Sequence, residues 1–117
     1  MSKITKQGLI GEDEAQKQVW LEESTRRWVE DLDERITAEF IMERWIVSRW
    51  EIPPDVDNMY SRADNRIAQY RIEKEWVKLL ERLAKRVKKE FSNRGFDVSI
   101  GWGNGENSWR WVQVIIE

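Results

Sequence analysis

Hydrophobic positions recur at helical spacing over residues 12–51, a stretch that contains neither glycine nor proline. Apolar side chains three, four or seven residues apart fall on one face of an α-helix, so the pattern predicts a helix over this whole range. Pro53 and Pro54 end it, because proline fixes φ and lacks an N–H, and residues 52–60 form a turn. The apolar face of the helix consists of Val29, Leu32, Ile36, Phe40, Val47 and Trp50.

A second helix is predicted over residues 61–94, and its two faces differ sharply. Gly95 is placed to close it in a left-handed conformation. One half of its surface is apolar: Tyr70, Ile72, Trp76, Val77, Leu79, Leu80, Leu83, Ala84, Val87 and Phe91. The other half is a basic stripe: Arg71, Lys74, Lys78, Arg82, Lys85 and Lys89.

After Gly95 the period of the hydrophobic pattern changes from 3.6 to 2, which is typical of a half-buried strand. Asn104 and Gly105 favour a tight type I′ turn, and residues 109–116 form the return strand, so residues 96–117 are predicted to be a β-hairpin. The return strand is apolar on both sides: Trp109, Trp111 and Ile115 point one way, and Val112, Val114 and Ile116 point the other. Helices can cover only one of these sides.

These elements predict an α+β fold, in which a long antiparallel helix pair is followed by a C-terminal β-hairpin packed on the helices. Residues 12–117 form a single domain, and residues 1–11 form either a flexible tail or a short third strand. Antiparallel packing places Glu43 near Arg66, and Arg35 near Glu73, as charged pairs between the helices.

Eight tryptophans stand in a chain that has no histidine and no cysteine. The missing residues exclude imidazole bases, thiolate nucleophiles and the usual zinc sites, so we expect a protein that is not an enzyme and needs no cofactor or metal. A carboxylate site built from Glu39, Glu43 and Glu73 lacks the histidines that helical di-metal centres add. Asp97, Glu106 and Glu117 likewise make no compact acidic triad.

The tryptophans divide into two groups by helical phase. Those on the apolar faces, Trp28, Trp50 and Trp76, are expected in the core. The remaining five, together with Ile41, are candidates for contact with a protein, because tryptophan is enriched in the centres of interfaces. The predicted interface is therefore Trp20, Ile41, Trp45, Trp102, Trp109 and Trp111.

Charge is segregated along the chain although the net charge is only −2. Residues 12–51 carry twelve acidic and six basic side chains, a balance of −6, whereas residues 61–94 carry five acidic and eleven basic ones, a balance of +6. Two readings remain open. The two helices could neutralise each other along their length, or the basic stripe could bind an acidic partner such as nucleic acid.

The leading hypothesis is a small protein-binding module that self-associates, as a homodimer, through its tryptophan-rich surfaces on the hairpin and the first helix. One alternative is a nucleic-acid-binding protein that uses the basic stripe. Another is a stoichiometric inhibitor or adaptor, of the kind found in mobile elements, that presents its acidic first helix to a nucleic-acid-binding protein. No small-molecule substrate is expected. A membrane span is not expected either, because no run of 18 apolar residues occurs. A cytoplasmic location is the default expectation, since the lack of cysteine fits a reducing compartment and residues 1–11 lack the long apolar core of a signal peptide.

Overall fold

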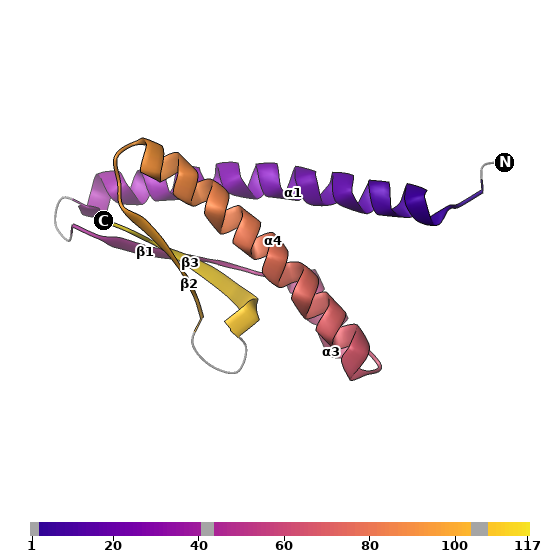
Figure 1. Ribbon diagram of the computed structural model, residues 1–117. Helices are drawn as coiled ribbons and strands as arrows, with labels where there is room; N and C mark the ends of the chain where they lie inside the picture. Colours follow the sequence, from indigo (N-terminus) through magenta and orange to yellow (C-terminus); the bar gives the residue numbers. More distant parts are fainter. Residues whose placement is uncertain (1–2, 41–43, 104–107) are drawn as a thin grey trace.

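The computed structural model describes residues 3–40, 44–103 and 108–117. It has an α+β fold in two layers, with the helices on one face of a three-stranded antiparallel sheet (Figure 1). The predicted fold class is therefore confirmed. In chain order the elements are α1 (Lys6–Arg35), the π-helical turn η1 (Ile36–Phe40), β1 (Ile46–Glu51), α3 (Pro54–Arg62), α4 (Arg66–Asn93), β2 (Val98–Trp102), the 3-10 turn η2 (Ser108–Arg110) and β3 (Trp111–Ile116).

The first helix differs from the prediction at both ends. It starts earlier, since residues 6–11 form its first turns rather than a tail or a strand. It also ends earlier, because residues 46–51 are strand β1 and not helix. Arg44, two residues before the strand, adopts a left-handed conformation with φ of 65°, which is uncommon for a residue other than glycine.

Strand β3 lies in the centre of the sheet, whose order is β1-β3-β2. The third strand thus comes from residues 46–51 and not from the N-terminus. The predicted hairpin of β2 and β3 is confirmed, with Ile100 opposite Val114, although the predicted turn at 104–105 lies outside the described residues. Both edges of β3 are hydrogen-bonded, so this strand cannot pair edge to edge with another chain.

The predicted turn over residues 52–60 is wrong, because α3 occupies residues 54–62. Proline is well tolerated in the first turn of a helix, where its missing N–H is not needed, and Asp55 and Asp57 in the same turn complement the helix dipole. The second predicted helix is confirmed as α4. Asn65 caps its start by accepting a hydrogen bond from the Ala68 N–H at 2.9 Å, and Gly95, with φ of 95°, follows its end.

Helices α1 and α4 run in the same direction, so the predicted antiparallel pairing is wrong. Lys17 lies 3.8 Å from Glu75, and further along both helices Asp33 bonds Arg94. The reason is topological, since β1 carries the chain back before α4 begins (Figure 1).

The residue pairs derived from antiparallel packing fail for the same reason. Arg35 bonds the Val47 carbonyl at 3.0 Å and Glu39 at 3.3 Å, and Glu73 lies on α4 at the other end of the helix pair. Glu43, the expected partner of Arg66, lies outside the described residues.

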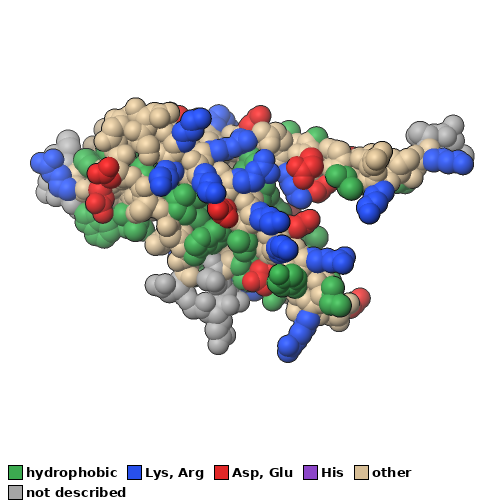
Figure 2. Space-filling view, in the orientation of Figure 1, with side chains coloured by type: hydrophobic (Ala, Val, Ile, Leu, Met, Phe, Trp, Pro, Cys, Tyr) green, Lys and Arg blue, Asp and Glu red, His purple; other side chains and the backbone are tan. Residues whose placement is uncertain are grey.

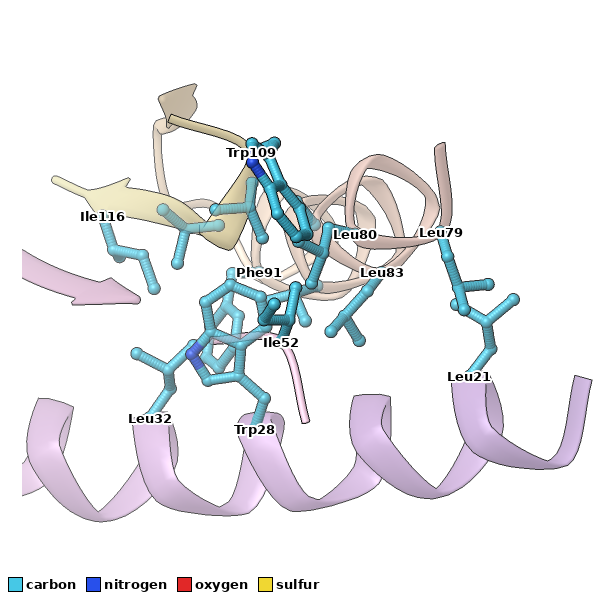
Figure 3. Packing of buried hydrophobic residues seen from close by; sticks show 14 of the residues in the cluster. Leu21, Trp28, Leu32, Ile52, Leu79, Leu80, Leu83, Phe91, Trp109 and Ile116 are labelled. Atoms are coloured by element: carbon cyan, nitrogen blue, oxygen red, sulfur yellow. The ribbon is translucent and has the colours of Figure 1, made fainter. Parts of the chain in front are cut away.

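The core lies between the helices and the inner face of the sheet (Figure 3). Trp28 of α1 is buried there, and its indole N–H donates to the Ser48 hydroxyl of β1 at 2.8 Å. Among the described helices, none combines the length and apolar composition needed to cross a bilayer. The largest fully buried side chains are Trp28, Phe91, Leu21, Leu32, Leu80, Leu83, Ile116, Val87, Val112 and Val114.

Candidate functional site

Most of the tryptophans predicted at an interface are packed within the fold. Trp109 is buried, and its ring lies 4.9 Å from that of Tyr60 in α3. Trp20 packs edge-on against Trp76 of α4, with ring centroids 5.4 Å apart. Trp102 pairs with Val112, a buried residue, and so faces the helices. These three positions contribute mainly to the core.

The other predicted interface residues lie apart from one another. Trp111 is half-buried on the helix-free face of the sheet, where its ring covers Gly103 and the Arg49 guanidinium lies 5.3 Å from it. Trp45 precedes β1 and is half-exposed. Ile41 lies outside the described residues. The five members of the predicted set that the structure describes do not form one surface.

The basic stripe forms one continuous feature on the outside of α4. All six of its side chains are exposed, and Figure 2 shows lysine and arginine gathered along this helix. They follow one another at intervals of three or four residues, which places them on the helix face opposite the buried Leu80 and Leu83. The sequence-derived stripe Arg71, Lys74, Lys78, Arg82, Lys85 and Lys89 is thus assembled as a single surface.

The stripe is only weakly engaged by neighbouring side chains. Lys85 pairs with Glu81 at 2.9 Å along its own helix, an exposed pair of small energetic value. Arg82 donates a hydrogen bond of 3.4 Å to Gln18 of α1. In the part of the chain that the structure describes, no ion pair joins a stripe cation to a carboxylate of α1.

The ion pairs that do connect the helices involve other residues. In one of them the cation, Lys17, comes from α1 and the carboxylate, Glu75, from α4, which is the reverse of the expected pairing. A hydrogen bond with Asp13, together with the charge of Glu75, raises the pKa of Lys17 despite partial burial. Arg94, whose hydrogen bond with Glu90 raises its pKa, lies beyond the end of the stripe. The acidic first segment therefore does not neutralise the stripe.

Helical periodicity predicted Tyr70 to lie on the apolar half of α4. Its ring is instead exposed, and the Lys74 ammonium lies 6.0 Å from the ring centroid. An aromatic residue thus stands at the N-terminal end of the stripe. Helical phase alone could not reveal this, because Tyr70 precedes the point where α4 meets the sheet. The exposed Ile67 one turn earlier lies on the same uncovered part of the helix.

The acidic residues that the structure describes form no alternative centre. Glu39 pairs with Arg35, and Asp97 and Glu117 exchange backbone hydrogen bonds at the end of the sheet. Glu106 is not among the described residues. Across residues 3–40, 44–103 and 108–117 there is no group of three or more carboxylates that could hold a metal ion.

Comparison of this chain with protein-family models, with curated proteins and with solved structures finds no match.

Proposed function

We propose that this protein binds nucleic acid through the phosphate backbone, using the basic stripe of α4. The observation that supports the proposal is that six cations remain exposed on one face of an uninterrupted helix, although an acidic helix lies beside it. Lysine and arginine that face solvent in a row are suited to replace the counterions of a polyanion.

The dimensions of the stripe fit a nucleic-acid backbone. Arg71 and Lys89 are separated by about 27 Å along the helix axis, roughly the rise of eight base pairs. Every member of the stripe is lysine or arginine, and cations spaced along one helix face suit a run of phosphates. Contacts to phosphate position a protein but carry little sequence information, so we expect binding with little sequence preference.

The acidic net charge does not prevent such binding. At physiological salt the Debye length is about 8 Å, so an approaching phosphate responds mainly to the cations nearest to it. A flat anionic membrane is a poorer partner, because surface-bound helices insert an apolar face, whereas the apolar face of α4, with Leu80 and Leu83, is buried against the sheet and α1.

The positions of the tryptophans give less support to the alternative hypothesis, self-association through tryptophan-rich surfaces. Trp109 is buried, Trp102 faces the helices and Trp20 packs on Trp76, so these side chains already have partners within the chain. A binding surface built on Trp109 would need the fold to open, because this side chain is buried.

Fluorescence anisotropy with a labelled duplex, measured at several salt concentrations, tests the proposal. If all six cations contact phosphates, log Kd should rise with log salt with a slope of about 5. The variant Lys78→Glu with Arg82→Glu should lower the slope by about 2 or more and weaken binding at low salt at least about tenfold.

The matched control is Arg26→Glu with Arg27→Glu, which makes the same change in net charge on the exposed surface of α1. It should bind almost as well as the wild type. No binding at low salt would refute the proposal, and so would an equal loss in both variants. Preferential binding to vesicles of anionic lipid would also contradict it. Circular dichroism melting curves establish that both variants are folded.

A further inference from the structure

We infer that two copies of this chain associate through the free edge of β2, which joins their two sheets into one. This contact goes beyond the proposed binding of nucleic acid and does not depend on the basic stripe. Within the described residues, the strand order β1-β3-β2 leaves one edge of β1 and one edge of β2 without a neighbouring strand. Such edges offer backbone N–H and C=O groups to another chain, and most proteins protect them.

The backbone groups at the free edge of β2 follow from its ladder with β3. Asp97 and Glu117 exchange both backbone hydrogen bonds, at 3.0 and 2.8 Å. Because bonded and non-bonded pairs alternate in an antiparallel ladder, Ser99 and Gly101 also bond to β3. The residues between them therefore direct their N–H and C=O groups away from β3. These residues are Val98, Ile100 and Trp102.

The two free edges of the sheet differ in how they are protected. On β1 the Arg35 guanidinium donates to the Val47 carbonyl at 3.0 Å, and the strand carries a charged pair, Arg49 and Glu51, 3.4 Å apart. Bound carbonyls and charged side chains discourage pairing with a further strand. Strand β2 has neither charge nor proline, and among the described side chains none bonds to its backbone. Of the two edges, that of β2 is suited to take another strand.

The inner side of β2 is also covered incompletely. Its three residues that face the helices each keep part of their surface exposed. Their neighbours on the central strand, by contrast, are fully buried: Val112, Val114 and Ile116. A strand added beside β2 would cover this apolar margin of the core, so burial of apolar surface adds to the new backbone hydrogen bonds.

The edge of β2 is complementary to itself, and this favours a second copy as the occupant. In an antiparallel pair about a two-fold axis at Ile100, this residue lies opposite its own copy, and Val98 lies opposite Trp102 of the other copy. Every free N–H and C=O of these residues then has a partner. On the inner face an aliphatic residue lies against an aromatic one, which is a favourable cross-strand pair. On the outer face Ser99 lies beside Gly101, so neither bulk nor charge opposes the pairing.

The helices leave room for this arrangement. Helix α4 contacts β2 and β3 to a similar extent, so its axis lies between these strands. With strands about 4.8 Å apart, the two α4 axes would be about 10 Å apart across the two-fold axis, a distance at which helices pack. The axis is perpendicular to the sheet and therefore keeps both basic stripes on the same side of the dimer. So short a ladder buries less than about 1,200 Å², and we expect a dissociation constant in the micromolar range.

Sedimentation velocity and amide hydrogen exchange of the full chain, over two orders of magnitude in concentration, test the inference together. The wild type should shift from monomer to dimer. Over the same range, exchange of the Ile100 and Trp102 amides should slow at least about tenfold, because they become hydrogen-bonded. The amides of Arg49 and Glu51 face the free edge of β1 by the same alternation, so their exchange should not change.

The variant Ile100→Pro removes the central N–H of the free edge, which makes no bond to β3, and should raise the dissociation constant at least about tenfold. The matched control Arg49→Pro makes the same change at the free edge of β1 and should still dimerise. Circular dichroism melting curves establish that both variants are folded. If Ile100→Pro does not fold, hydrogen exchange of the wild type decides alone.

A wild-type chain that stays monomeric would overturn the inference and leave a strand of another protein as the partner of this edge. A dimer in which the Ile100 amide exchanges as fast as in the monomer would also overturn it. So would a dimer that survives Ile100→Pro, or one that is lost in both folded proline variants. Nucleic-acid binding by the Ile100→Pro monomer reports on the stripe separately.

Discussion

Replacing Ser48 by alanine should destabilise the protein far more than the loss of one hydroxyl on a surface strand. The Ser48 side chain accepts a hydrogen bond of 2.8 Å from the indole N–H of Trp28, which joins β1 to α1. Trp28 is 1% exposed and Ser48 is 7% exposed, so water cannot replace the lost acceptor. The substitution leaves a buried donor without a partner.

The expected loss of unfolding free energy is about 2 kcal/mol, the cost of an orphaned buried donor. For a chain of this length, such a loss lowers the Tm by about 8 °C. Urea unfolding followed by circular dichroism measures the first quantity, and a thermal scan measures the second. Ser99→Ala, at an exposed position of β2, is the control and should change stability by less than about 0.5 kcal/mol.

A double-mutant cycle makes the test specific to this contact. Trp28→Phe removes the donor, so the combined variant should be more stable than the sum of the single losses by about 1 kcal/mol. If residues 12–51 were one helix, positions 28 and 48 would lie about 30 Å apart and could not couple. Losses that add to within about 0.3 kcal/mol would therefore refute the contact and the strand assignment of residues 46–51.

Two further substitutions test the sheet and its aromatic cover. A Cβ at Gly103 would overlap the Trp111 ring, so Gly103→Ala should lower the free energy of unfolding by about 1 to 3 kcal/mol, measured by urea titration. The control Gly101→Ala meets only the flexible Gln113 side chain at 3.0 Å and should cost distinctly less in the same titration. Trp109→Ala should lower the free energy of unfolding by about 3 to 5 kcal/mol, because Trp109 is buried within one chain. The sedimentation coefficient of the folded monomer should not change. An unchanged Tm would contradict the burial of Trp109 in the core.

The elements predicted correctly are those in which apolar and polar residues follow one regular period. Helix α4 has a clean apolar half and a terminal Gly95, and β2 alternates strictly, so both were identified. Strand β1 was missed because its inward position between Ile46 and Trp50 is Ser48, which hides the alternation. The positive-φ residue just before the strand also gave no signal, because it is Arg44 and not glycine.

The missed strand explains most of the other differences. An undetected β1 made the two helices appear to be joined by a turn, and this implied the antiparallel direction and the wrong charge pairs. Pro54 was interpreted as a helix stop, although it also begins α3, with Asp55 and Asp57 in the first turn as an available signal. The six positions of the stripe were predicted correctly as exposed, because the polar half of a two-faced helix points away from the core; the exposure of Tyr70, on the apolar half, was not predicted. Whether the acidic helix α1 would cover the basic stripe could not be predicted. That depends on the topology of the fold, which the local hydrophobic pattern of the sequence does not specify.

The central position of β3 determines when the sheet can form during synthesis. Strand β1 ends at Glu51 and β2 ends at Trp102, yet each makes its ladder with residues 111–116 alone. While the chain grows from its N-terminus, both strands must therefore wait with unpaired edges until residues 111–116 have left the ribosome. Helices α1 and α4 depend mainly on local contacts, so the nascent chain should expose an apolar helical face for this whole interval.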